Sequence, residues 1–238
     1  ISYRLVGSEM CIRDRSWLLL SLLLGCKAET LGVELPRGGR DQISQEDLQR
    51  DVWSLTKIED RVAGAEEAAA HLQQRFQEMH TRPGFGRSYQ ARADEGGIVV
   101  CAEREGQSAK PVLILAEDPG QGAAAGAVPL AVLISAAKGF DVAGLHEKTA
   151  MLCALIGPGA REHFLSQPPT PLDGALTATL IGPVSAATPA TEVVSLGGID
   201  FTRVTAGDIP DPDVMEAIDY RDIQTLTVAV FDQAIKAP

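Results

Sequence analysis

The chain has 238 residues and carries 32 acidic against 21 basic side chains, so its formal net charge is −11. A negative charge of this size opposes binding to nucleic acid or to an anionic membrane face. Aromatic residues make up only 5% of the chain, which argues against a surface that stacks bases or sugars.

The N-terminal region does not show the pattern of a folded domain. Residues 1–15 lack periodicity and resemble translated adapter sequence, so we exclude them from the fold. Residues 16–26 are a leucine-rich run that is too short to span a bilayer, which takes roughly 20 apolar residues. The run fits a signal peptide, and its last four residues, Leu-Leu-Gly-Cys, resemble a bacterial lipobox that would be lipidated at Cys26. An ordinary signal peptide and a buried apolar helix are the alternatives.

The lipobox predicts an exported protein that is anchored to a membrane through its N-terminal lipid. Lys27 follows the cysteine where inner-membrane lipoproteins commonly carry aspartate, so we expect the periplasmic face of the outer membrane. A soluble periplasmic protein is the alternative. Residues 27–43 are rich in glycine and charge and are predicted to be a tether. Residues 44–238 are then long enough for a single α/β domain.

Apolar spacing predicts alternating helices and strands over this domain. Ser44 opens a capping-box-like entry to a first helix, and a second helix is predicted over residues 65–79. The later predictions are strands at 97–103 and 112–116, a helix at 126–138, a strand at 149–156, a helix at 160–166, strands at 176–181 and 192–196, and a helix at 220–236. Several strands are almost continuously apolar, which is typical of a sheet covered on both faces. The pattern predicts a three-layer αβα sandwich with a mostly parallel mixed sheet.

Two cysteines lie inside predicted strands. Cys101 and Cys153 each belong to an apolar run. We predict small buried thiols for both, with a disulfide or a metal pair as the alternatives.

Six segments carry a resemblance to a known family, in the same order along the chain. They are KIEDRVAGAE at 57–66, IVVCA with a following glycine at 98–106, PVLILAED at 111–118, GAAAGAVPLAVLISAAK at 122–138, LTATLIG at 176–182 and DIPDPDVMEAID at 208–219. In degenerate form they resemble the landmarks of the zinc aminopeptidases, the family (peptidase family M twenty-eight) that includes bacterial leucyl aminopeptidase, aminopeptidase Y and glutamate carboxypeptidase. The resemblance implies the family's αβα fold and a site for two zinc ions.

The residues that would hold those zinc ions are replaced. The resemblance places the metal ligands at Ala116 (a histidine in the family), at Ala124 or Ala125 (the bridging aspartate), at Thr179 (an aspartate) and at Asp208 (a histidine). The family's Glu-Glu pair, which supplies a general base and a ligand, would fall at 157–160, where this chain reads Gly-Pro-Gly-Ala. A catalytic zinc needs several protein ligands and an open position. We therefore expect no zinc and no other cofactor.

A few carboxylates could still form a residual pocket. Glu117 and Asp118 follow a predicted strand, at the edge where open α/β sheets bind their ligands. Asp208 and Asp213 belong to an acidic turn before the last helix. Solvent-facing or helix-capping roles are the alternative for these side chains.

These features favour a non-catalytic, exported lipoprotein with a peptidase-like domain, a pseudoenzyme that binds a protein, a peptide or another ligand. Two alternatives stay open. The chain could be an active metal-dependent hydrolase whose relocated ligands include the four carboxylates above. It could also be an unrelated α/β ligand-binding domain.

Overall fold

The computed structural model of the chain describes most residues between positions 37 and 236. The described residues are 37–58, 64–80, 87–107, 111–118, 120, 123–142, 149–172, 175, 177–182, 191–196, 198–205 and 218–236. The predicted signal peptide with Cys26 lies outside them, as do Asp208 and Asp213. No helix of the described part is both long and apolar enough to cross a membrane.

The strands of the described residues form one mixed sheet. They are β1 (Arg87–Arg92), β2 (Ile98–Arg104), β3 (Pro111–Asp118), β4 (Thr149–Ile156), β5 (Thr177–Gly182), β6 (Thr191–Leu196) and β7 (Ile199–Thr205). Their order in space is β1-β2-β4-β3-β5-β7-β6. The central strands β4, β3, β5 and β7 are parallel, whereas β1, β2 and β6 pair antiparallel with their neighbours.

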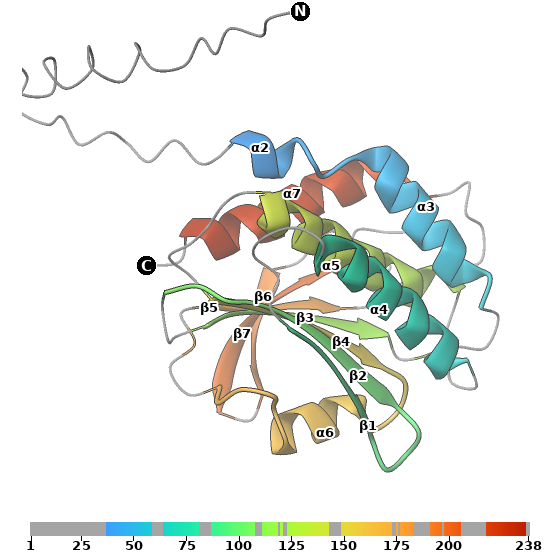
Figure 1. Ribbon diagram of the computed structural model, residues 1–238, viewed down its shortest axis with the longest axis vertical. Coiled ribbons are helices and arrows are strands. Elements are labelled where there is room, and N and C mark those ends of the chain that lie inside the picture. Colours follow the sequence, from blue (N-terminus) through green and yellow to red (C-terminus); the bar gives the residue numbers. More distant parts are fainter. Residues whose placement is uncertain are drawn as a thin grey trace, which may run out of the picture. The chain divides into compact units, whose positions relative to one another are not determined.

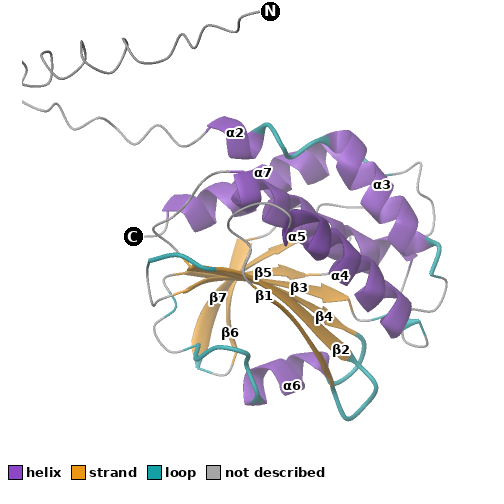
Figure 2. Ribbon diagram, viewed as in Figure 1, coloured by secondary structure: helices purple, strands orange, loops and turns teal. Residues whose placement is uncertain are grey.

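Helices cover both faces of this sheet. They are α2 (Arg37–Arg40), α3 (Gln45–Thr56), α4 (Ala65–His80), α5 (Ala123–Val142), α6 (Ala160–Ser166) and α7 (Tyr220–Lys236). Figure 1 shows α3, α4, α5 and α7 on one face and α6 on the other. The same layers appear in Figure 2 as purple helices on the two sides of the orange strands. The predicted three-layer αβα sandwich is confirmed.

The central strands are apolar because both of their faces are buried. Every residue of β3 is buried. Leu113 and Leu115 belong to the apolar cluster that includes Ala160 and Phe164 of α6. The intervening Ile114 points to the opposite face, which the larger layer of helices covers (Figure 1). A run with hydrophobic side chains at consecutive positions thus fits a strand between two layers of helices.

Helix α5 is the centre of the larger helical layer. It begins three residues before the predicted helix and ends four residues after it, and most of its side chains are buried. Gly139 lets α5 approach α7 closely, because a Cβ there would lie 3.1 Å from the ring of Phe231. Phe140 packs against that ring edge-on, with the two ring centroids 5.1 Å apart. Close packing of small and aromatic side chains therefore joins the two helices.

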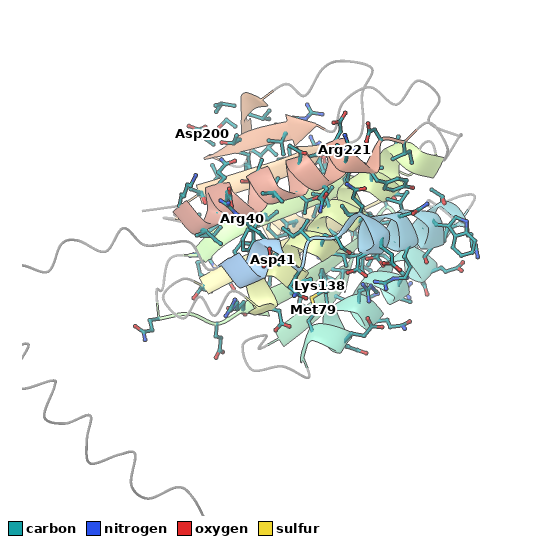
Figure 3. The ribbon with its side chains drawn as sticks, turned by 90° about the horizontal axis from the view of Figure 1, so that it is seen from above. Arg40, Asp41, Met79, Lys138, Asp200 and Arg221 are labelled. Atoms are coloured by element: carbon teal, nitrogen blue, oxygen red, sulfur yellow. A yellow bond between two sulfur atoms is a disulfide. The ribbon has the colours of Figure 1, made fainter. Side chains whose placement is uncertain are left out.

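The N-terminal end of the folded part differs from the prediction. Residues 37–43 were expected to belong to a tether, but Arg37–Arg40 form α2 and Ile43 is only 1% exposed. Arg40, labelled in Figure 3, donates from Nε to Oδ1 of Asp232 on α7 over 2.7 Å. The folded unit therefore begins before Ser44. The prediction missed this because four residues are too few for a recognisable helical period.

The prediction of two separate thiols is wrong. Cys101 of β2 and Cys153 of β4 are directly opposite each other in antiparallel strands, and they form a disulfide. Both residues are buried, at 2% and 0% exposure, in the apolar cluster on the α6 face. The apolar runs revealed that each cysteine is in a buried strand. They did not reveal that these two strands are neighbours in this register.

Candidate functional site

A pocket of about 260 Å³ lies at the carboxyl ends of β3 and β4. Its lining consists of Glu117, Asp118, Leu155, Gly157, Pro158, Arg161, Glu162 and Arg203. This is the edge of the sheet at which open α/β folds bind ligands. The lining mixes acidic and basic side chains with a short glycine-containing turn, so the pocket is polar and of both charge signs.

The two acidic residues that end β3 point to opposite faces of the sheet, as consecutive strand residues do. Asp118 is 1% exposed, and its Oδ1 accepts a hydrogen bond from the backbone N–H of Gly120 over 2.9 Å. Its backbone carbonyl accepts a hydrogen bond from the N–H of Gly157 over 2.8 Å. Asp118 therefore connects the end of β3 to the turn that follows β4.

Glu117 points to the α6 face, where Arg161 forms a bidentate ion pair with it. Arg161 donates from Nε to Oε1 over 2.5 Å and from Nη2 to Oε2 over 2.6 Å. The hydrogen bond to Glu117 raises the pKa of Arg161, and the charges of Glu117 and Glu162 act in the same direction. Only 9% of the Glu117 side chain is exposed. Both oxygens of this buried carboxylate are therefore engaged by a cation supplied by the chain itself.

The turn between β4 and α6 forms another wall of the pocket. Gly157 and Gly159 have φ angles of 76° and 74°, in the left-handed region that favours glycine. Gly97 lies against this turn, because a Cβ built on Gly97 would come within 2.2 Å of the Pro158 carbonyl oxygen. The sequence resemblance places the family's Glu-Glu pair at these positions, and this wall of the pocket is built mainly from backbone.

The positions to which the sequence resemblance assigns metal ligands are spread over two strands, a helix and a segment outside the described residues. Ala116 and Thr179 are both 0% exposed and lie on the neighbouring strands β3 and β5. Residue Ala124 is in the first turn of α5, and Asp208 lies outside the described residues. Alanine has no donor atom, and a lone threonine hydroxyl is a poor zinc ligand. Within the described ranges there is no cluster of three or more His, Cys, Asp or Glu side chains that could hold a metal ion.

The pocket includes some of the predicted site residues and adds others. Glu117 and Asp118 both line it. The predictions for Asp208 and Asp213 lie outside the described residues. Arg161 and Arg203 were not predicted from the sequence as site residues. Arg161 could have been suspected because it follows the glycine turn at a strand end. Arg203 gave no such signal, because β7 was not predicted as a strand.

Comparisons with known proteins relate the chain to others through its fold. No protein-family model and no curated protein matches it. The solved LapA aminopeptidase of Legionella pneumophila is 11% identical with a TM-score of 0.65, over 86% of this chain and 75% of that one. A Zn-dependent exopeptidase from Parabacteroides distasonis is 14% identical with a TM-score of 0.61, over 82% of this chain and 98% of that one.

A glutaminyl cyclase from Porphyromonas gingivalis is also similar in structure. It is 12% identical with a TM-score of 0.59, over 81% of this chain and 99% of that one. These similarities establish that the chain has a peptidase-like fold, of the kind found in zinc-dependent exopeptidases and glutaminyl cyclases. A shared fold at identities this low does not carry the chemistry of those proteins over to this chain.

Proposed function

We propose that this chain is a non-catalytic, exported lipoprotein whose peptidase-like domain binds a ligand or a partner in the pocket at the ends of β3 and β4. The ion pair between Glu117 and Arg161 is the observation that carries the proposal. A guanidinium engages both oxygens of the pocket's most accessible strand-end carboxylate, and this pairing supports a binding role over metal chemistry.

The chemistry of the replaced positions supports the same conclusion. A catalytic zinc activates water when several imidazole, carboxylate or thiolate ligands hold it and one position stays open. Here the methyl group of Ala116 and the hydroxyl group of Thr179 are buried in the core. The turn at Gly157 and Pro158 lacks a general base. The residues of the pocket suit binding better than hydrolysis.

The proposed export is supported by the disulfide. A bond between Cys101 and Cys153 forms and persists in oxidising compartments, such as the bacterial periplasm, and is rare in the cytosol. The lipobox-like end of residues 16–26 supports a lipid anchor at Cys26, and Lys27 favours the outer membrane. The net charge of −11 favours a protein or peptide partner over nucleic acid.

Metal analysis combined with activity assays tests the non-catalytic part of the proposal. We expect purified protein to contain no stoichiometric zinc and to show no turnover of aminoacyl anilides or in a glutaminyl cyclase assay. Stoichiometric zinc with turnover would overturn the proposal. If such turnover disappeared in the Asp118→Ala and Asp208→Ala variants, relocated carboxylates would be the ligands instead.

Cell fractionation with mass spectrometry tests the anchor. We expect the mature chain to begin at residue 26, to carry the mass of a lipid modification and to sediment with outer membranes. The Cys26→Ser variant should lose both the added mass and the membrane association. A wild-type chain that is processed elsewhere, or that is recovered without lipid in the soluble periplasmic fraction, would contradict the anchor.

A further inference from the structure

Arg161 has hydrogen-bond donors beyond those that Glu117 uses. A guanidinium presents five N–H donors in a planar fork, and the ion pair engages one on Nε and one on Nη2. Among the described residues no hydrogen bond involves the other three, which belong to Nη1 and Nη2. The Arg161 side chain is 42% exposed and lines the pocket. The pocket therefore offers pre-oriented donors to a planar acceptor group.

The ion pair with Glu117 fixes the position of these donors. Glu117 is held by the backbone of the central strand β3, and its two oxygens restrict the rotation of the guanidinium plane. Arg203 of β7 brings a second positive charge to the same lining. Arg161 is already oriented by its ion pair. It therefore loses less conformational entropy on binding a ligand than an unpaired arginine side chain would.

The acidic residues of the lining disfavour ligands that carry only negative charge. Glu117, Asp118 and Glu162 outnumber the two arginines, so a purely anionic ligand such as inorganic phosphate meets repulsion as well as attraction. A carboxylate with an N–H or ammonium group beside it complements both signs. The volume of about 260 Å³ is smaller than the roughly 300–1,000 Å³ of sites for drug-sized ligands. It suits a group of the size of one amino acid.

We infer that the pocket binds the carboxylate of a free amino acid or of a peptide C-terminus, with Arg161 as the anchor. The inference rests on the proposed function, because Arg161 can play this part only while Glu117 pairs with it and not with a metal. The two oxygens of a planar carboxylate match the fork of a guanidinium. A peptide C-terminus and a free amino acid both carry this group, and they differ in the nitrogen beside it, which is an amide in the peptide and an ammonium in the amino acid.

Calorimetric titration of the intact protein at neutral pH tests the inference. The probes are N-acetyl-dialanine, its C-terminal amide, dialanine amide and free alanine. We expect a probe with a free carboxylate to bind at least tenfold more tightly than both amides. Preference for N-acetyl-dialanine would identify a peptide end as the ligand, and preference for alanine would identify an amino acid. Equal binding of carboxylate and amide, or no binding of any probe, would overturn the inference.

Variants of Arg161 and Glu117 provide a second test in the same titrations. Arg161→Lys keeps a cation beside Glu117 but loses the planar fork, and we expect at least fivefold weaker carboxylate binding. The double variant Glu117→Gln/Arg161→Gln leaves no unpaired buried charge, and it should lose the preference for carboxylate over amide. Arg221→Gln is the matched control, because Arg221 is exposed on α7 (Figure 3), and α7 lies on the opposite face of the sheet from α6 (Figure 1). Unchanged carboxylate preference in the double variant would contradict the assignment of Arg161.

The failures of the two proposals can be told apart. Zinc with hydrolysis or cyclisation would contradict the non-catalytic function, whatever the probes do. Absence of zinc and turnover, combined with equal binding of carboxylate and amide probes, would contradict only the ligand assignment.

Discussion

At the scale of single residues, the ion pair between Arg161 and Glu117 organises the pocket. Glu117 is almost buried at the end of a central strand, whereas Arg161 is partly exposed. A carboxylate in this setting is costly to bury unless it is paired and hydrogen-bonded. The two partners come from segments 44 residues apart in sequence, so their pairing also connects α6 to the sheet.

Removing the cation alone should destabilise the fold. In the Arg161→Ala variant, the Glu117 carboxylate loses both donors, and we expect the free energy of unfolding to fall by about 1–3 kcal/mol. The Glu117→Gln/Arg161→Gln variant should recover part of that loss because it leaves no unpaired charge. Urea denaturation monitored by circular dichroism measures both. Equal stability of wild type and Arg161→Ala would show that water satisfies Glu117.

Thr179 provides a second test at this scale. Its side chain is fully buried, and its hydroxyl has no hydrogen-bond partner among the described residues. We expect Thr179→Val to be as stable as wild type or up to about 1 kcal/mol more stable, because the methyl group removes an unsatisfied polar atom at similar volume. Binding in the pocket should be unchanged.

Thr227→Val is the matched control for this substitution. Thr227 is equally buried, but its hydroxyl donates to the carbonyl oxygen of Ile223 over 2.8 Å. We expect the control to lose about 0.5–1.5 kcal/mol of stability in the same denaturation experiment. A loss at Thr179 as large as that at Thr227 would reveal a polar partner for Thr179.

At the scale of elements, a carboxylate at the start of α3 connects that helix to α5. The N–H of Asp47 donates to the Ser44 hydroxyl, which caps α3. The Asp47 carboxylate pairs with Lys138 of α5 and with Arg50. Burial raises the pKa of Asp47, but the hydrogen bond and charge of Lys138, with the charge of Arg50, outweigh it and lower the pKa below its ordinary value of 3.8.

This shift predicts a particular loss of stability in acid. The folded-state pKa of Asp47 lies below the unfolded-state value, so the carboxylate stabilises the fold above about pH 4 and this contribution disappears as the pH falls through the lower folded-state pKa. In Asp47→Asn, the decrease in unfolding free energy below pH 4 should be shallower than in wild type. Glu46→Gln, at an exposed neighbouring position, should keep the wild-type pH dependence. Identical pH profiles for all three proteins would exclude this role of Asp47.

Elements with strong periodicity could be predicted from sequence, and polar ones could not. The bounds of β4 and α7 match the prediction because the first is a continuous apolar run and the second has a clear helical stripe. Strand β1 was missed because its residues, RSYQAR, belong to an edge strand and carry little apolar signal. Strand β7 was missed because charged residues interrupt its apolar positions.

The candidate site shows the same division. Glu117 and Asp118 could be placed at the ligand-binding edge because they end an apolar strand. The role of Arg161 depends on β3 and β4 lying side by side in parallel, with Asp118 paired to Ile156, so that the start of α6 meets the end of β3. That adjacency follows from the tertiary arrangement, which a local pattern does not encode.

At the scale of the whole molecule, the disulfide closes a long stretch of chain. Cys101 and Cys153 are 52 residues apart, and the enclosed segment contains β3 and α5. A cross-link of this span stabilises mainly by restricting the unfolded chain. We expect the Cys101→Ala/Cys153→Ala variant to lose about 2–5 kcal/mol of unfolding free energy.

Chemical denaturation of the oxidised protein, the reduced protein and the double variant checks this expectation. The reduced protein should resemble the double variant, because both lack the cross-link. Wild-type stability in the double variant would show that the packed strands alone hold this part of the sheet together.

The contact between Gly97 and the Pro158 carbonyl has a consequence for how this pocket can change. The turn after β4, which lines the pocket, has its main chain packed against the main chain of Gly97, so a methyl group at position 97 would collide with that turn. A substitution of Gly97 would disturb the backbone of this turn and would not add a side chain that contacts a ligand. Variation in what the chain binds must therefore come from the other lining residues, of which Arg161 and Glu162 on α6 and Arg203 on β7 have long side chains.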